Sequence, residues 1–237
     1  MTATIKPNPA APLWLFDFDN TLAALERQVD WAASRLALES FLRAERIDEA
    51  IFREFPARNL PLYNGLLMRW RGGAPDAAPL MRQASAIIES FELRGVEKAA
   101  PLPGALELLA ALYASGKRVA VVTSNSSRTV IRWLTRHSLT REVGPIVGRD
   151  SLLPLKPGPD MVRRALELCD TSVSDAVLVG DSEADLLAAN AAGVGFLGVA
   201  AEPVARKRLE GLGAHEVFAS PAALALHLRL SGFLAEA

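Results

Sequence analysis

The spacing of hydrophobic positions changes along this chain of 237 residues, and the change predicts two kinds of structure. Residues 13–16 are four consecutive large apolar side chains, which is typical of a short strand buried on both faces of a sheet. Residues 23–98 instead carry apolar positions at helical spacing, and no segment there reads convincingly as a strand. We expect helices in this stretch at about 47–55, 60–70 and 77–93, separated by Pro56, Pro61 and the segment 71–73.

From Pro101 onward the pattern alternates between short aliphatic runs and amphipathic helical segments. The aliphatic runs predict strands at 118–122, 145–147, 176–179, 194–199 and 215–218. Strands that are separated by single helices favour a parallel sheet with helices on both faces. We therefore predict an α/β fold with a Rossmann-like parallel sheet at its centre.

The two patterns together predict that one domain interrupts another. Residues 13–22 and 99–237 form the Rossmann-like core in this interpretation. We expect residues 23–98 to form an all-helical insertion that follows the first strand and lies over the edge of the sheet. Residues 1–12 hold one charged side chain and several prolines, so we expect a flexible tail without the apolar centre of a secretory signal.

The composition narrows the range of partners. The 26 basic and 27 acidic residues nearly cancel, which argues against binding to nucleic acid or to an anionic membrane surface. No uninterrupted apolar stretch approaches the roughly 18 residues that a membrane span requires. Cys169 is the single cysteine, so the chain has neither an internal disulfide nor Cys/His zinc spacing, and we expect a soluble protein in the reducing cytoplasm.

Two carboxylates follow the first predicted strand, in the segment Asp17-Phe18-Asp19-Asn20-Thr21. A spacing of two residues along an extended chain places both acids on one side of the sheet edge. Carboxylates beside an apolar interior are unfavourable unless a cation or a developing charge compensates them. A divalent metal with a phosphoryl group would do so, although an ordinary Asp- and Asn-rich turn explains the segment when it is considered alone.

A second polar segment, Thr123-Ser124-Asn125, follows the predicted strand 118–122. Ligands of open parallel sheets bind at the carboxyl ends of the strands, so this position is a candidate site. Hydroxyls and free N–H groups at the start of the next helix suit a phosphate group. Ordinary N-capping by Ser126 or Ser127 is the alternative explanation.

Asp181 follows the predicted strand 176–179 and is a hard oxygen ligand of the kind that Mg²⁺ binds. The nearby Ser182 and Asp185 have the spacing of a capping box, which explains them without any function but leaves Asp181 unexplained. Lys156 lies in a loop stiffened by prolines, where a lysine taken alone is usually only solvated.

Taken together, these segments resemble the phosphatase branch of the haloacid dehalogenase superfamily, over the chain from about Leu13 to the C-terminus. The motifs that carry the resemblance are Asp17-Phe18-Asp19-Asn20-Thr21, Thr123, Lys156 before Pro157, and Gly180-Asp181-Ser182 with Asp185. The helical insertion looks like the family's C1-type cap, which is similar to that of the phosphoglycolate phosphatase and phosphomutase subfamily. The segment Ala23-Ala24-Leu25 departs from the phosphoglycolate phosphatase pattern and weakens that specific assignment.

The resemblance implies a Mg²⁺-dependent phosphatase that acts on a small phosphorylated metabolite. In this mechanism Asp17 attacks phosphorus and becomes an aspartyl phosphate, while Asp19 is first the general acid and then the general base. The implied phosphoryl-binding residues are Thr123, Ser124, Asn125 and Lys156. The implied Mg²⁺ ligands are Asp17, the backbone carbonyl of Asp19, Asp181 and Asp185, the last directly or through water.

The resemblance leaves three other functions to consider, namely a dehalogenase, a phosphomutase and a catalytically silent binding protein. Asp19 argues against a dehalogenase, because a halide leaving group needs no proton. A phosphomutase would keep the same motifs, whereas a catalytically silent binding protein would usually lose one of the acids or the lysine. The cap would select the substrate, with 58–65 as a candidate lid loop and, as candidate specificity residues, Arg58, Tyr63, Arg69 and Arg71.

Overall fold

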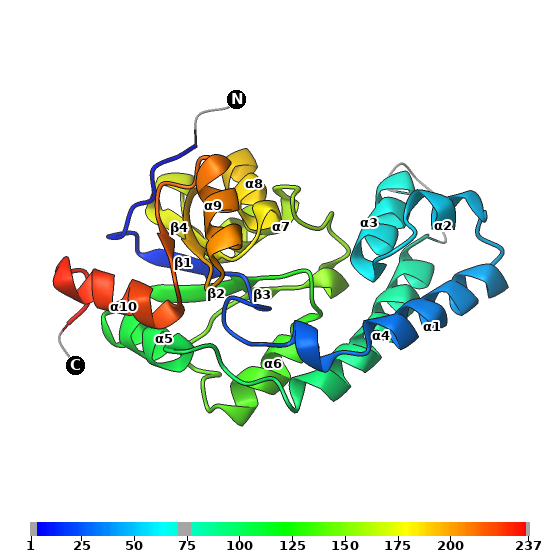
Figure 1. Cartoon of the computed structure of the whole chain (residues 1–237), viewed down its shortest axis with the longest axis horizontal. Coiled ribbons are helices and arrows are strands. Elements are labelled where there is room, and N and C mark those ends of the chain that lie inside the picture. Colours follow the sequence, from blue (N-terminus) through cyan, green and yellow to red (C-terminus); the bar gives the residue numbers. More distant parts are fainter. Residues whose placement is uncertain (1–3, 71–76, 236–237) are drawn as a thin grey trace.

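The computed structural model describes residues 4–70 and 77–235, and a parallel six-stranded sheet lies at its centre (Figure 1). The strands are β1 (Leu13–Phe16), β2 (Arg118–Val122), β3 (Ile146–Val147), β4 (Ala176–Gly180), β5 (Gly195–Val199) and β6 (Val217–Phe218). They lie in the order β3-β2-β1-β4-β5-β6, and every neighbouring pair is parallel. This arrangement confirms the predicted α/β fold with a Rossmann-like sheet.

The register of β1 aligns the carboxyl ends of the three central strands. Phe16, the last residue of β1, is opposite Val121 of β2 and Val179 of β4. Both of these neighbouring strands end one residue later. The polar residues that follow β1, β2 and β4 therefore emerge at one edge of the sheet.

Helices cover both faces of the sheet, as the alternating pattern predicts. One face, which includes Leu13 and Leu15, packs against α7 (Asp160–Leu168), α8 (Glu183–Ala192) and α9 (Pro203–Gly211). The other face, which includes Trp14 and Phe16, packs against α5 (Ala105–Ala114), α6 (Ser127–Arg136) and α10 (Pro221–Leu230). All four side chains of β1 are buried because consecutive residues of a strand point to opposite faces.

Between β1 and α5 the chain forms a helical block, which projects to one side of the sheet (Figure 1). Its elements are η1 (Glu26–Gln28), α1 (Trp31–Ala44), α2 (Ala50–Glu54), α3 (Asn59–Trp70) and α4 (Ala77–Val96). Asp30 caps α1 by accepting a hydrogen bond from the Ala33 N–H at 2.9 Å. Among the described residues no helix, not even α4 with its 20 residues, is long and apolar enough to cross a membrane.

Residues 59–65 are helical and do not form the lid loop that we expected at 58–65, because α3 begins at Asn59. Pro61 does not interrupt the helices either. It lies in the first turn of α3, where the missing N–H has no acceptor within the helix. Gly65 lets α3 approach α2 closely, since a Cβ there would lie 2.3 Å from the ring of Phe55.

Residues of the described N-terminal segment 4–12 contact the core. Ala11 is fully buried, and the Lys117 ammonium donates hydrogen bonds to the carbonyls of Ala10 and Ala11 at 3.2 Å. Pro7 lies so close to Gly195 of β5 that a Cβ on this glycine would stand 2.6 Å from the Pro7 Cα. Residues 1–3 of the predicted tail lie outside the described residues.

Candidate active site

Asp17 directly follows β1 and is buried at the edge of the sheet, with 6 % of its surface exposed. Its N–H donates to the carbonyl of Val179 at 2.9 Å and so extends the pairing with β4 by one residue. One carboxylate oxygen, Oδ1, accepts a hydrogen bond from Lys156 Nζ at 2.5 Å. The other, Oδ2, accepts from the Thr21 hydroxyl at 3.3 Å. A cation and a hydroxyl therefore hold the carboxylate in one orientation.

Asp181 and Asp185 lie beside Asp17, and we call these three residues the acid cluster. One carboxylate oxygen from each lies within 4.8 Å of the other two. Asp185 Oδ2 accepts from the Ser182 N–H at 3.1 Å while the Ser182 hydroxyl accepts from the Asp185 N–H, which confirms the capping box. Gly180 permits this approach, because a Cβ there would lie 2.5 Å from the Asp185 Cβ.

Burial sets the charge state of the acid cluster. It raises the pKa of Asp17 from 3.8 to about 6, and it raises the pKa of Asp181 to about 9 with help from the charges of Asp17 and Asp185. Burial alone would lower the pKa of Lys156, but the charges of Asp17 and Asp185 outweigh it and raise that pKa above its ordinary value. One lysine therefore faces three carboxylates, and the ionised cluster keeps an excess of negative charge.

A divalent cation would fit this excess charge. Carboxylate oxygens are the ligands that Mg²⁺ prefers, usually one or two of them together with water and substrate phosphate. The spacing of the three oxygens allows one ion to contact them all. The acid cluster thus has the donor atoms and the uncompensated charge of a divalent metal site, and the Asp19 carbonyl stays a prediction as a further ligand.

Lys156 reaches the acid cluster from the loop that follows β3. Its ammonium donates to Asp17 Oδ1 and to Asp185 Oδ1, each at 2.5 Å, and to the Val122 carbonyl at 3.0 Å. The side chain is 4 % exposed, so Lys156 is a buried part of this site and not a solvated lysine. The loop is tied to the helical block, because the Leu155 N–H donates to Asn64 Oδ1 of α3 at 2.9 Å.

Asp19 is oriented by backbone groups rather than by a cation. Its Oδ1 accepts from the N–H groups of Leu25 and Glu26 at 2.9 and 2.8 Å. Burial raises the pKa of Asp19 from 3.8 to about 7; the Glu26 N–H lowers it and the Asp17 charge raises it by smaller amounts. Asp19 therefore stands near half protonation at neutral pH, which suits a group that must both give and take a proton.

The loop of residues 123–126, which we call the 123–126 loop, follows β2 and leads into α6. The Thr123 hydroxyl donates to Asn125 Oδ1 at 3.1 Å and accepts from the Asn125 N–H at 3.2 Å. Ser126 caps α6 by accepting from the Thr129 N–H, which was the alternative explanation for this serine. Capping does not account for Thr123 and Asn125, whose side chains are buried and hydrogen-bonded to each other.

A cavity of about 1000 Å³ lies between this edge of the sheet and the helical block. The sequence-predicted residues that line it from the core are Asp17, Asp19, Thr123, Ser124, Asn125, Lys156, Asp181 and Asp185. Apolar side chains that line it from the helical block include Trp31, Phe55, Leu60 and Met68. The structure therefore brings every predicted core residue to one cavity, and the helical block lines the opposite side with both apolar and polar side chains, the latter including Glu54, Asn64 and Arg69.

The structure separates the four candidate specificity residues. Arg58 and Arg69 line the cavity, and Arg69 forms an ion pair with Glu54. Tyr63 is fully buried on another side of α3, where its hydroxyl donates to the carbonyl of Arg149 at 3.3 Å. Arg71 lies outside the described residues.

Two polar residues of the cavity wall, Glu26 and Asn64, did not stand out in the sequence. Glu26 Oε2 accepts from the Asn20 amide at 2.9 Å, and the Glu26 N–H orients Asp19. Asn64 positions the loop that carries Lys156. A glutamate seven residues after Asp19 and an asparagine in a helix carry no motif, so no local signal in the sequence identifies either residue.

The chain is similar in sequence to proteins that are described as hydrolases and phosphatases. A family model described as haloacid dehalogenase-like hydrolase matches residues 14–199. A phosphoglycolate phosphatase from Rhodospirillum rubrum is 30 % identical over 212 residues, which are 86 % of this chain and 85 % of that protein. A phosphoglycolate phosphatase from Mesorhizobium japonicum is 28 % identical over 197 residues, which are 79 % of this chain and 82 % of that protein.

Solved structures show the same similarity over most of the chain. The crystal structure of CbbY from Rhodobacter sphaeroides in complex with phosphate matches with a TM-score of 0.61 and 26 % identity, covering 90 % of this chain and 96 % of that one. A mutant of the same protein in complex with xylulose-(1,5)bisphosphate matches with a TM-score of 0.59 and 25 % identity, over the same shares of the two chains. The similarity includes both the sheet and the region of the helical block.

Proposed function

The chain belongs to the haloacid dehalogenase-like hydrolase family, and from this premise we propose that it is a Mg²⁺-dependent phosphatase that hydrolyses a small phosphomonoester through an aspartyl phosphate. The observation that carries the proposal is the convergence of Asp17, the two further acids of the cluster and Lys156 on one cavity. Family membership alone gives the fold, whereas this set of side chains supports the chemistry.

Asp17 is the nucleophile in this proposal. Its Oδ2 attacks phosphorus, the bond from phosphorus to the ester oxygen breaks, and the phosphoryl group is left on Asp17. The carboxylate must be ionised to attack, and Lys156 favours that form by donating to Oδ1. Thr21 donates to Oδ2, so the attacking atom is held in position before the substrate binds.

Asp19 transfers the protons of both steps. Protonated Asp19 donates its proton to the leaving alkoxide, and the resulting carboxylate then takes a proton from the water that hydrolyses the aspartyl phosphate. A pKa of about 7 makes both forms accessible at neutral pH. The N–H groups of Leu25 and Glu26 hold one carboxyl oxygen, which leaves the other to carry the proton.

The remaining oxygens of the phosphoryl group bind to Lys156 and to the 123–126 loop. The Ser124 N–H and the second N–H of the Asn125 side-chain amide are donors that this loop offers, and all three residues, Thr123 included, line the cavity. The Thr123 hydroxyl would become a further donor by turning its O–H from Asn125 Oδ1 to the phosphate while its oxygen still accepts from the Asn125 N–H. Mg²⁺ held by Asp17, Asp181, Asp185 and the Asp19 carbonyl would offset the repulsion between the attacking carboxylate and the phosphate anion. These are the roles that the sequence resemblance implied for the same residues.

We propose that the helical block is the cap that selects the substrate. The relatives named above are phosphoglycolate phosphatases, and the CbbY mutant structure holds a sugar bisphosphate, so a small anionic metabolite is the substrate class. Arg58 is the candidate partner for a second anionic group, because it lines the cavity and makes no ion pair within the described residues, whereas Arg69 is paired with Glu54.

We place the enzyme in the cytoplasm, since Cys169 is its single cysteine and is free.

The direct test is hydrolysis of an aryl phosphate and of a panel of small phosphomonoesters, with Mg²⁺ and with excess chelator. We expect turnover that requires Mg²⁺, with a preferred substrate that carries a second anionic group. Turnover that is equal in chelator would contradict the metal dependence. Binding of inorganic phosphate without any turnover across the panel would instead indicate a catalytically silent member of the family.

A further inference from the structure

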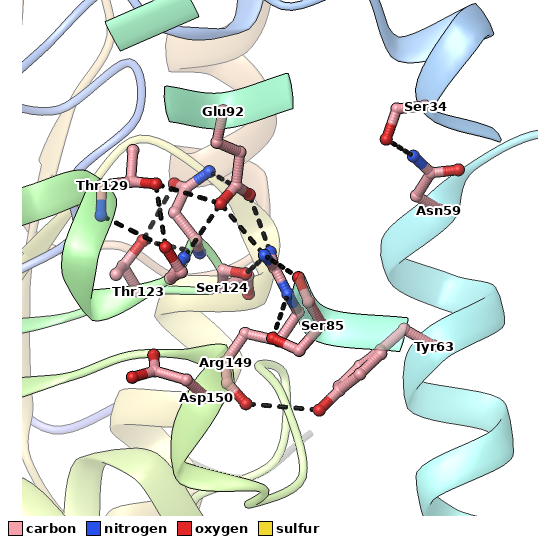
Figure 2. Close-up of polar contacts among 12 residues, drawn as sticks. Ser34, Asn59, Tyr63, Ser85, Glu92, Thr123, Ser124, Thr129, Arg149 and Asp150 are labelled. Carbon is pink, nitrogen blue, oxygen red and sulfur yellow. Dashed lines mark hydrogen bonds and ion pairs between the residues drawn. The ribbon is translucent and has the colours of Figure 1, made fainter. Parts of the chain in front are cut away.

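A second group of buried charges lies next to the 123–126 loop and plays no part in the chemistry proposed above. It consists of Glu92 in α4 of the helical block and Arg149 at the start of η2 (Arg149–Ser151), just after β3. Their side chains form an ion pair with contacts of 2.7 and 3.0 Å, and both are fully buried. Figure 2 shows the pair between α4 and the loop that carries Thr123 and Ser124.

Arg149 uses every N–H of its guanidinium group. Nε donates to Ser85 Oγ at 3.2 Å, and Nη2 donates to the Ser85 carbonyl at 3.3 Å as well as to Glu92. Nη1 donates to Glu92 and to the Ser124 carbonyl at 2.9 Å. All five donors thus have acceptors, two from Ser85 of α4, two from Glu92 and one from the 123–126 loop.

Glu92 connects the pair to the 123–126 loop. Its Oε1 accepts from the Asn125 side-chain amide at 3.1 Å, and its Oε2 accepts from the Ser126 N–H at 3.1 Å. The Thr129 hydroxyl adds a contact to Oε2 at 3.3 Å. Because the side-chain oxygen Oδ1 of Asn125 in turn accepts from the Thr123 hydroxyl, a continuous chain of hydrogen bonds runs from Glu92 to a phosphoryl-binding residue.

Stability alone does not explain a pair of charges in this position. Desolvating both groups is costly, and apolar residues of similar volume often give equal or greater stability than a buried ion pair. An apolar pair would, however, offer no acceptor to the Ser126 N–H or the Asn125 amide. What the charged pair adds is therefore a fixed geometry for the 123–126 loop.

We propose that Glu92 and Arg149 are positioning residues for the phosphate subsite, an inference that rests on the proposed phosphatase function. Glu92 holds Asn125 and Ser126, Arg149 holds the Ser124 carbonyl, and Thr123 is oriented through Asn125. The helical block thereby contributes to binding of the transferred group through α4, in addition to covering the leaving group.

This assignment predicts a specific kinetic signature. The 123–126 loop contacts only the phosphoryl group, which is the same in every substrate. Loss of Glu92 should therefore reduce kcat/KM by a similar factor for all phosphomonoesters, whatever their leaving groups. Loss of a residue that contacts the rest of the substrate would instead change the order of the substrates ranked by kcat/KM.

The test compares Glu92→Gln with the matched control Glu89→Gln. Glu89 lies one turn earlier on α4 and also pairs across to α6, through Arg128, but within the described residues it makes no hydrogen bond or ion pair to the 123–126 loop. In Glu92→Gln, an amide NH₂ replaces an oxygen that accepts hydrogen bonds. We expect binding of inorganic phosphate in the presence of Mg²⁺, measured by calorimetry, to weaken roughly tenfold in Glu92→Gln and to stay near wild type in Glu89→Gln.

Hydrogen exchange gives a second measurement that needs no turnover. We expect the backbone amides of residues 123–127 to exchange faster in Glu92→Gln than in wild type or Glu89→Gln, while those of β4 stay unchanged. Unchanged exchange together with unchanged phosphate binding would overturn the proposal. If wild type binds phosphate but does not turn over substrates, the proposed function fails while the positioning role is still tested.

A double variant separates positioning from folding. Glu92→Met with Arg149→Met removes both charges at once, so no unpaired charge is left in the core and the protein should fold even where a single variant does not. We expect a thermal midpoint below that of wild type, because the Ser126 N–H and the Asn125 amide lose their acceptor, but above that of either single Met variant, together with phosphate binding weakened at least as much as in Glu92→Gln. Wild-type phosphate binding in a stable double variant would overturn the proposal.

Discussion

The molecule contains two buried groups of charges only a short distance apart along the same edge, and they differ in how well their charges are compensated. The acid cluster of Asp17, Asp181 and Asp185 faces a single lysine, and burial raises the pKa of Asp17 to about 6 and that of Asp181 to about 9. In the Glu92–Arg149 pair, one cation faces one anion, and every N–H of the guanidinium has an acceptor.

This difference in charge compensation distinguishes a site that can carry out a reaction from a pair of residues that holds its neighbours in position. A group of buried carboxylates that the protein leaves partly uncompensated can bind a cation and a reacting phosphate, since both bring the missing interactions. A buried pair whose hydrogen bonds are complete within the protein has nothing left to bind. Changes in the first group should therefore alter catalysis and metal binding, and changes in the second should alter the position of the 123–126 loop.

The largest effect is expected from Asp17→Asn. The amide is not nucleophilic, so kcat should fall by at least about 10⁴-fold, which is the scale seen when a nucleophile is removed. The fold should stay intact, because asparagine has nearly the same shape and Thr21 can still donate to its oxygen. Steady-state kinetics and circular dichroism on the same preparation check both statements. A variant with wild-type activity would exclude Asp17 as the nucleophile.

A smaller and selective effect is expected from Asp19→Asn. Alkyl phosphates need a proton on the leaving oxygen, so their kcat/KM should fall by about 10²- to 10⁴-fold, whereas aryl phosphates with acidic leaving groups should lose far less. In wild type, kcat/KM for alkyl phosphates should decline as pH rises through about 7, because Asp19 then loses the proton that it donates.

The control for Asp19 is Glu26→Gln, which changes a neighbouring acid of the same cavity. Because the charge of Glu26 helps to raise the pKa of Asp19, this variant should shift the pH profile for alkyl phosphates to lower pH, and at pH values below that shift it should affect alkyl and aryl phosphates equally. Equal losses for both substrate types in Asp19→Asn would contradict its role as general acid.

The smallest effect concerns stability. The raised pKa values of Asp17 and Asp181 mean that the metal-free folded state holds protons that the unfolded chain releases above about pH 4. The two protonated acids therefore contribute fully to the free energy of unfolding below about pH 4. This contribution is lost as pH rises through about 6 for Asp17 and about 9 for Asp181. Mg²⁺ would compensate the ionised acids, so its stabilising effect should grow over this range.

Thermal unfolding at about pH 6 and about pH 8.5, with Mg²⁺ and with chelator, measures that difference. We expect the Mg²⁺-induced rise in the midpoint to be larger at the higher pH and to shrink in Asp181→Asn. A rise that is absent, or larger at the lower pH, would show that the acid cluster does not bind the ion.

The acid cluster was accessible from the sequence because its residues follow recognisable strands. Asp17 comes directly after four buried apolar residues, and Asp181 follows the aliphatic strand β4, so a parallel sheet brings them together. The prediction of the sheet needed only alternation of strands and helices. The register of β1 with β2 and β4 then explains why the strand ends meet.

The Glu92–Arg149 pair was not accessible in this way. From the sequence, a glutamate in a long amphipathic helix is expected to be solvated, and Arg149 lies in an irregular segment after a two-residue strand. The two residues are 57 positions apart in the sequence, and no periodic signal pairs them. The helix predicted at 60–70 is confirmed by α3, whereas the lid loop expected at 58–65 is wrong, since Pro61 suggests a helix breaker until its place in the first turn is known.

The most direct test of the central claim is to trap the phosphoryl group on the protein. Wild-type enzyme mixed with an aryl phosphate and Mg²⁺ is quenched in acid within the first turnover, and fragment mass spectra are recorded for the peptide that contains residues 13–22. The account predicts one phosphoryl group on Asp17 in wild type and none in Asp17→Asn. A phosphoryl group on another residue, or turnover without any labelled protein, would contradict it.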